Sequence, residues 1–143
     1  MKDTAVVEIA APQDKVAELF VDPRNNTAWM EDVARYEPLS GQQGMPGSTY
    51  RLIPKKGSMV FTATVVERTL PNTLRLSLDA SNVTVDVRTT LSPIAADRTR
   101  LVSEEEFRFK GLSRIFSLFA RPAIRKAHRQ HMEAFKQFAE RSP

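Results

Sequence analysis

The feature that most constrains this sequence is its C-terminal stretch, residues 111–141, whose periodicity predicts one long helix. At roughly 100° per residue, one side of this helix is apolar and the opposite side is basic. The predicted apolar side comprises Leu112, Ile115, Phe116, Phe119, Ala123, Ile124, Ala127, His131, Ala134, Phe135 and Phe138. The predicted basic side comprises Arg114, Arg121, Arg125, His128, Arg129 and Lys136. At about 1.5 Å per residue the helix approaches 45 Å, so we expect a long partner that wraps around it.

Pro122 lies inside this helical pattern. A proline in a helix interior removes one backbone hydrogen bond, and its ring clashes with the preceding turn. We therefore expect two helical segments with a kink near Pro122. The kink should lift the first half of the helix away from the sheet.

The sequence before this helix predicts seven strands and two short helices. A strand at residues 4–10 is followed by a helix at 13–21, and Asp22 and Pro23 then provide the start of a second helix that ends at Trp29. Runs with a period of two residues predict the other strands, at 33–39, 48–53, 59–70, 73–80, 83–94 and 99–109. The short connections between them predict antiparallel pairing, because parallel neighbours need long crossovers. The predicted class is α+β, with a seven-stranded antiparallel sheet wrapped around the C-terminal helix.

Composition limits the classes of protein that remain. The 143 residues fit a single domain with one core. The absence of cysteine excludes disulfides, thiolate metal sites and a cysteine nucleophile, and it favours a cytoplasmic protein. The charged first residues argue against a signal peptide, and no stretch has the apolar length of a membrane span. Residues 110–141 hold eight of the 21 basic and two of the 17 acidic residues, so the basic character belongs to the C-terminal helix.

Two segments carry a resemblance to a known family: VEIAAPQDKVAELFVDPRNNTAWMEDV at residues 7–33 and VVERTLPNTLRLSL at 65–78. With the long C-terminal helix, they resemble the START/Bet v1-like (SRPBCC) helix-grip superfamily, and in particular its polyketide cyclase/dehydrase-like branch. The matching positions are Ala11, Pro12, Val16, Phe20, Asp22, Trp29, Gly47 and Pro71. The resemblance implies one helix-grip domain over residues 1–143, with a deep apolar cavity for lipids, polyketides or aromatic molecules. Because such proteins include carriers, receptors and enzymes, the resemblance does not settle the activity.

We expect this cavity to lie between the sheet and the first half of the C-terminal helix. Its predicted lining is Tyr50, Leu52, Phe107, Phe116, Phe119 and Ala123. Trp29 either covers the mouth of the cavity or fixes its own helix to the sheet. Tyr36 is expected at the rim or on the surface. No cofactor is expected.

Glu105 is the acidic residue of greatest chemical interest. It shares strand parity with Phe107 and Phe109, which should face inward, so Glu105 should face inward as well. An isolated buried carboxylate is costly, and burial would raise its pKa. The alternative is a bulge, or a strand end that leaves the sheet, either of which would turn Glu105 toward water.

The two histidines lie three residues apart on the C-terminal helix. His131 falls on the apolar side, where a bond to a backbone carbonyl or to one carboxylate is the ordinary arrangement. The pair lacks both the HExxH spacing and a third ligand, so no metal site is expected. No nucleotide-binding glycine motif is present, and chain order alone suggests no Ser, His and Asp arrangement.

Three functions remain open. The first is binding of an apolar small molecule in the sheet-helix cavity. The second is a polyketide cyclase or dehydratase activity that uses Tyr50, Glu105 or His131 for acid-base chemistry. The third uses the basic helix face to dock an acidic protein, an anionic membrane surface or nucleic acid. That face has no interleaved aromatic residues, so we favour a solvated face and expect no nucleic-acid partner. The sequence leaves both a monomer and a homodimer open.

Overall fold

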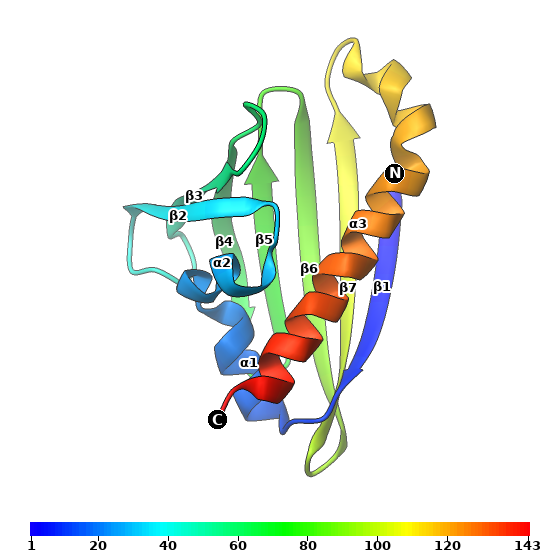
Figure 1. The fold of residues 1–143 in the computed structure, drawn as a ribbon. Helices are drawn as coiled ribbons and strands as arrows, with labels where there is room; N and C mark the ends of the chain where they lie inside the picture. The colour runs from blue at the N-terminus through cyan, green and yellow to red at the C-terminus, as the bar shows by residue number, and fades with distance from the viewer.

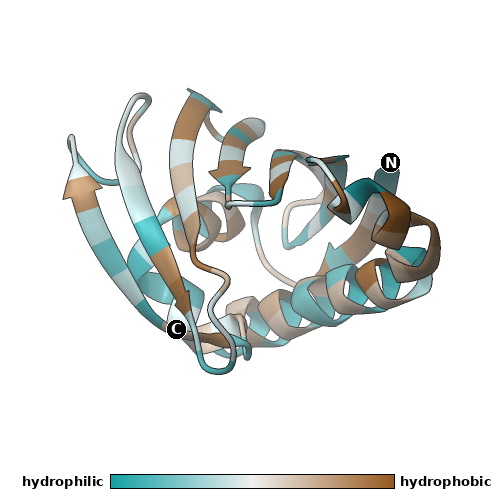
Figure 2. Cartoon of the chain, turned by 90° about the horizontal axis from the view of Figure 1, so that it is seen from above, coloured by the Kyte–Doolittle hydropathy of each residue, from teal (hydrophilic) through white to brown (hydrophobic).

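Alternating apolar and polar residues build one antiparallel sheet, which curves along one side of a long helix (Figures 1 and 2). The computed structural model describes all residues from 1 to 143. In the sheet the strands follow the order β1-β7-β6-β5-β4-β3-β2. Their bounds are β1 Lys2–Ile9, β2 Val33–Ser40, β3 Thr49–Pro54, β4 Phe61–Thr69, β5 Thr73–Asp79, β6 Val83–Ala95 and β7 Arg98–Phe109. This is the α+β helix-grip arrangement that the sequence predicted.

The connection between the two edge strands contains three short helical elements. They are α1 (Gln13–Val21), the 3-10 helix η1 (Pro23–Asn25) and α2 (Asn26–Trp29). As predicted, Asp22 caps the start of η1, since its side chain accepts a hydrogen bond from the backbone N–H of Arg24 at 3.0 Å. From β2 to β7 the strands form a continuous meander, and β1 then pairs with β7.

The C-terminal helix, α3, spans Ser113–Arg141. It begins two residues later than predicted because Gly111 has a φ of 59°, a left-handed conformation that suits glycine and does not continue a helix. At its other end the carboxylate of Glu140 accepts a hydrogen bond from the backbone N–H of Ala10 at 2.8 Å. None of the helices combines the length and the hydropathy that a membrane-spanning helix requires.

The second half of α3 provides the core of the domain. Phe135 is fully buried, with its ring centroid 4.9 Å from that of Phe20 and 5.3 Å from that of Trp29. Phe20 and Trp29 themselves stack at 5.8 Å. These edge-to-face and stacked contacts hold α1, α2 and α3 together. Trp29 therefore fixes α2 to the core, which is one of the two roles considered for it.

The sequence predicted that Pro122 would divide the C-terminal helix into two segments, and this prediction was wrong. The helix is continuous through Pro122, although its first turns run in a different direction from the rest in Figure 1. These turns are indeed lifted away from the sheet. They extend so far that Phe116 is 68% and Phe119 is 78% exposed.

The predicted apolar face of α3 is correct at Ile124, Ala127 and Phe135, but the predicted faces are wrong in the first turns and at His128, because the apolar side changes along the helix. Phe116 and Met132 are separated by 16 residues, which turns a regular helix to a point about 160° away. Phe116 therefore points away from the face that packs on the sheet. His128 was assigned to the basic outer side, but it is only 2% exposed. The residues of α3 that are buried are His128, Met132, Phe135 and Ala139.

A truncation of Phe135 tests this core. We expect Phe135→Ala to lower the free energy of unfolding by about 3–5 kcal/mol, because it leaves a cavity among three aromatic contacts. Gln137→Ala, on the exposed side of the same helix, should change it by less than about 0.5 kcal/mol. Urea unfolding of both variants measures the difference. A Phe135→Ala protein as stable as the wild type would show that α3 does not carry the core.

Candidate functional site

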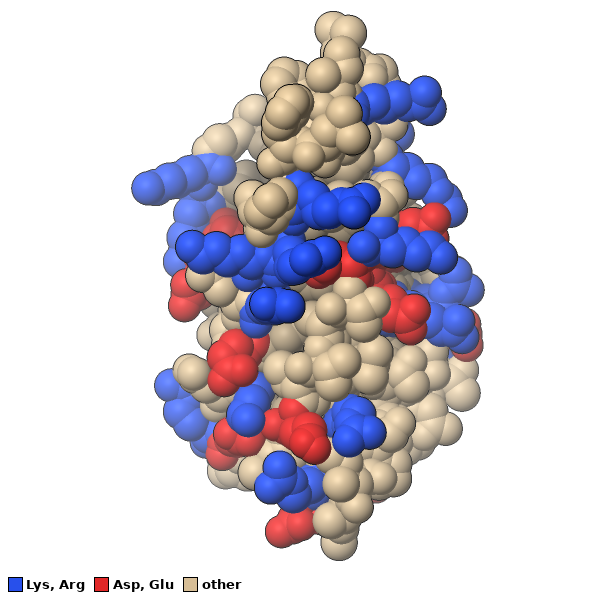
Figure 3. All heavy atoms as spheres, turned by 90° about the vertical axis from the view of Figure 1, so that its right-hand side faces the viewer, with Lys and Arg blue, Asp and Glu red and all other residues tan.

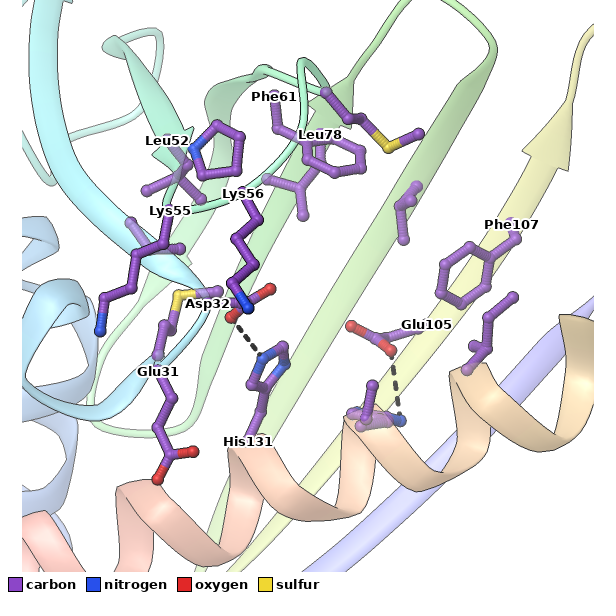
Figure 4. A pocket seen from close by; sticks show the side chains of 18 residues that line it. Glu31, Asp32, Leu52, Lys55, Lys56, Phe61, Leu78, Glu105, Phe107 and His131 are labelled. Atoms are coloured by element: carbon purple, nitrogen blue, oxygen red, sulfur yellow. Dashed lines mark hydrogen bonds and ion pairs between the residues drawn. The ribbon is translucent and has the colours of Figure 1, made fainter.

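A cavity of about 520 Å³ lies between α3, the β3–β4 hairpin and the middle of the sheet. Most of its wall is apolar, and the side chains that enclose it come from α3, the six strands β2 to β7, the β3–β4 hairpin loop and the segment after α2 (Figure 4). Its apolar lining is Met30, Val33, Leu52, Pro54, Met59, Phe61, Leu78, Val85, Phe107, Ile124 and Ala127. The bend of α3 explains the space, since the helix leaves the sheet N-terminal to its packed half.

A smaller chamber of about 70 Å³ adjoins this main cavity on the side of the aromatic core. The two spaces share part of their lining, and the shared polar residues are Glu105, His128 and His131. Trp29 and Tyr50 line only the inner chamber. We call these three residues the polar corner, and they face both spaces.

Glu105 occupies this corner and points toward α3 in Figure 4. Its strand is regular there, because Glu105 pairs with Val87 in an unbroken register from Val83 to Pro93 of β6. The bulge considered from the sequence is therefore absent. Burial raises the pKa of Glu105, although the neighbouring histidines His128 and His131 act in the opposite direction. A carboxyl group in this position can hold a proton and donate a hydrogen bond.

His128 connects α3 to the two strands at the N-terminal edge of the sheet. Its Nδ1 lies 2.8 Å from Oδ2 of Asp3 on β1 and 3.3 Å from Oε1 of Glu105. Its Nε2 lies 2.8 Å from Oγ of Ser103 on β7. A carboxylate only accepts hydrogen bonds, so Nδ1 donates to Asp3. Each nitrogen of this buried ring is thereby paired, which offsets the cost of burying it.

The hydrogen bonds connect Asp3 to His128 and His128 to Ser103, which is the order of bonding in a Ser-His-Asp catalytic triad. Acyl transfer also needs two free hydrogen-bond donors for the developing oxyanion. Ser103 lies in the interior of β7, where it pairs with Ala5 on one side and Thr89 on the other. The sheet thus uses the backbone donors around Ser103. The three residues form a polar connection between helix and sheet rather than a nucleophilic site.

His131 lies one turn farther along α3, at the edge of the main cavity. Its Nε2 is 2.9 Å from Oδ1 of Asp32, which confirms the expected bond to one carboxylate (Figure 4). Burial lowers the pKa of His131, but the bond to Asp32 and the charge of Glu105 outweigh this effect and raise it. The same bond lowers the pKa of Asp32.

Trp29 and Tyr50 line the inner chamber, and Tyr36 packs against Tyr50 from outside it. Burial raises the pKa of Tyr50 to about 12, so its hydroxyl remains protonated near neutral pH. Tyr36 packs edge-on against it at 5.4 Å and donates a hydrogen bond from its hydroxyl to Gln43 at 2.8 Å. Trp29 Nε1 is buried and has no hydrogen-bond partner. Trp29 lines the inner chamber, and its indole N–H is a hydrogen-bond donor without an acceptor.

Three predicted cavity residues do not line either space. Phe116 and Phe119 project into solvent, and Ala123 is exposed without lining the cavity. The other predicted residues are placed around the cavity: Leu52, Glu105 and Phe107 in its main part, and Trp29 and Tyr50 in the inner chamber. No group of three or more acidic, histidine or cysteine side chains is arranged to hold a metal ion.

Sequence reasoning missed His128 and its two strand partners. His128 precedes the buried residues Met132 and Phe135 by four and seven positions, which is the spacing of one helix face. That spacing was the available signal. The partners Asp3 and Ser103 could not be found in the same way, because they belong to other strands that lie far away in the sequence.

The titration of Glu105 can be tested through stability. Because its pKa is raised above 4.5 in the folded protein, the folded state holds a proton that the unfolded chain releases. Protonation of Glu105 therefore stabilises the folded protein at a pH below the pKa that Glu105 has in the unfolded chain. This stabilisation is lost as the pH rises through the pKa that Glu105 has in the folded protein. Glu105→Gln removes this titration and preserves the shape of the side chain. We expect the stability of the wild type relative to this variant to fall as pH rises from about 4 to 8.

Urea unfolding of both proteins over this pH range measures the difference. Groups that do not interact with Glu105 titrate alike in both proteins, so their effects cancel, whereas His131 in the variant also loses the Glu105 charge that raises its pKa. Stability curves that stay parallel would contradict a raised pKa at Glu105.

Known proteins supply both a family and a fold for this chain. A sequence model of the family described as polyketide cyclase / dehydrase and lipid transport matches residues 2–140. No curated protein matches the chain in sequence. Among solved structures, the Zhui aromatase/cyclase from Streptomyces sp. R1128 superposes with a TM-score of 0.83 at 18% identity, over 99% of this chain and 94% of that one.

Two further structures share the fold. A START superfamily protein from Mycobacterium smegmatis has a TM-score of 0.72 at 18% identity, and 97% of this chain and 94% of that chain are covered. Truncated norcoclaurine synthase from Thalictrum flavum has a TM-score of 0.74 at 11% identity, with coverage of 100% and 95%. At these identities the structures show the fold alone, whereas the sequence model covers nearly the whole chain. The chain therefore belongs to the polyketide cyclase / dehydrase and lipid transport family.

Proposed function

We propose that this protein binds an apolar small molecule that carries an oxygen-containing group, of lipid, polyketide or aromatic type. The observation that carries the proposal is the cavity of about 520 Å³, whose apolar walls converge on one polar corner. A volume of this size suits a small organic ligand, and such sites typically combine apolar walls with a few polar groups. The apolar part of the ligand would contact Leu52, Phe61 and Phe107.

The polar corner favours a ligand with a hydrogen-bond acceptor. Protonated Glu105 would donate to a carbonyl or hydroxyl oxygen, and the raised pKa makes this form available nearer to neutral pH. Trp29 Nε1 is a further donor for a ligand that reaches the inner chamber. Related folds bind molecules of this kind: norcoclaurine synthase from Thalictrum flavum was solved in complex with dopamine and hydroxybenzaldehyde. The resemblance supports the ligand class without identifying the ligand.

A pair of alanines on α3 provides a matched test of binding. Ala127 lines the main cavity, whereas Ala123 lies one turn earlier outside it. We expect Ala127→Trp to fill part of the cavity and to weaken binding of the apolar dye anilinonaphthalene sulfonate by at least about ten-fold, or 1.4 kcal/mol. Ala123→Trp should bind the dye as the wild type does. Dye titration by fluorescence measures both, and equal affinity in all three proteins would remove the cavity as the binding site.

A second function, a cyclase or dehydratase activity, has one specific observation in its favour. A carboxyl group with a raised pKa and a histidine with a raised pKa lie in the same cavity. In a dehydration, protonated Glu105 would protonate the departing hydroxyl group while neutral His131 accepts the proton from the adjacent carbon. Tyr50, with a pKa of about 12, would orient the substrate through hydrogen bonds.

Glu105→Gln distinguishes an enzyme from a binding protein. Glutamine keeps the shape and a hydrogen-bond donor but cannot release a proton. If the protein only binds its ligand, affinity for an aromatic ketone that it binds should change by less than about two-fold, and no product should form with either protein. If it is a dehydratase, kcat on an aromatic β-hydroxy ketone should fall by about 100-fold or more while KM is nearly unchanged. Mass spectrometry of the reaction mixture measures turnover.

A further inference from the structure

The first turns of α3 carry an unusual group of exposed apolar side chains. We call it the apolar cap, and its five members are between 61% and 81% exposed: Leu112, Ile115, Phe116, Leu118 and Phe119. Monomeric proteins rarely expose several large apolar side chains next to one another without a partner. These residues line neither chamber of the cavity, so the proposed ligand does not account for them.

Basic side chains follow the apolar cap directly along the same helix. We call them the basic band: Arg121, Arg125, Lys126 and Arg129, which together line a surface groove of about 380 Å³. Figure 3 shows this arrangement, with an upper end nearly free of charged side chains above a band of Lys and Arg. The sequence contains no acidic residue from Phe107 to Met132. This part of the chain therefore combines apolar side chains with basic ones, while the acidic side chains beside the band in Figure 3 come from other segments. Asp3 of β1 is an acidic residue that pairs with Arg125.

We propose that the apolar cap and the basic band dock the protein onto an anionic membrane surface. Interfacial segments of this kind insert apolar side chains to a depth of about 5–10 Å, and basic residues beside them contact the anionic headgroups. Arg121 and Lys126 lie two and seven residues after Phe119, or about 3–10 Å along the helix. When the apolar cap enters the acyl region, the basic band thus lies at the level of the headgroups.

Charge favours a membrane over an apolar protein partner. Arg125 is ion-paired with Asp3 at 3.4 Å, whereas Arg121, Lys126 and Arg129 have no ion-pair partner. A second copy of this chain would bring an identical basic band next to the first, whereas an anionic bilayer neutralises these three charges. A docked molecule would also present its cavity to the bilayer. The β3–β4 hairpin, which includes the cavity residues Lys55, Lys56 and Met59, lies at the same upper end as the first turns of α3 in Figure 1. The docking inference stands on exposed side chains and does not depend on the proposed ligand.

Flotation with lipid vesicles tests the docking. The probes are vesicles of phosphatidylcholine alone and vesicles of phosphatidylcholine with phosphatidylglycerol in equal parts. We expect the wild type to bind the anionic vesicles and to lose most of this binding in high salt. Phe116→Ser/Phe119→Ser should weaken binding by at least about ten-fold, because it removes two inserted rings. Arg121→Gln/Lys126→Gln should weaken it by about 25-fold, since each basic residue contributes about five-fold.

Matched controls remove the same kinds of side chain elsewhere. Leu39→Ser/Val66→Ser changes two exposed apolar residues of the sheet, and Arg51→Gln/Arg98→Gln removes two exposed charges outside α3. Both should bind vesicles within about two-fold of the wild type. Circular dichroism and urea unfolding establish that each variant is folded, which is expected because the altered residues are exposed.

Several results would overturn the proposal. One is a wild type that does not bind anionic vesicles; another is binding that neither α3 variant weakens. A third is a stable dimer in sedimentation velocity that Phe116→Ser/Phe119→Ser dissociates, with no vesicle binding by the wild type. That outcome would assign the apolar cap to a second copy of the chain.

Discussion

The structure depends on the way in which α3 docks on the sheet with its second half only. Phe135 and Met132 pack into the core, and one turn before Met132 the contact becomes polar. There His128 bonds to Asp3 and Ser103, each at 2.8 Å, so that both nitrogens of a buried ring are satisfied. Beyond this point the helix leaves the sheet and the cavity begins. His128 therefore marks the boundary between the packed core and the space that can hold a ligand.

The same boundary explains the chemistry of the cavity. A helix that packed along its full length would bury Glu105 among apolar side chains, and one that docked less would expose it to water. In the structure Glu105 is partly enclosed, with a histidine on either side, and its pKa is raised by burial. His131, in contrast, bonds to Asp32, which reaches it from the segment before β2. The polar corner thus contains an acid and a histidine whose environments differ although they lie in one cavity.

The sequence predicted the sheet well, because strand parity is a local property, and it left the direction of Glu105 open between an inward position and a bulge that turns it to water. Alternation in residues 73–109 was sufficient to place Leu78 and Phe107 on one face. It could not predict where α3 would touch that face. Phe116 and Phe119 have the apolar character of core residues, and the path of the helix together with their position on its outer side leaves them in solvent. Asp3 and His128, 125 residues apart, are brought together by β1 pairing with β7, which no local pattern reports.

That pairing of the first strand with the last has a consequence for biosynthesis. Domains begin to fold from the N-terminus while the chain is still being made, but β1 has no strand partner until β7 has been synthesised. α3 is synthesised later still, so Asp3 meets His128 only after α3 has been made. The cavity is therefore completed only after α3 has been made, and it cannot enclose a ligand before that point.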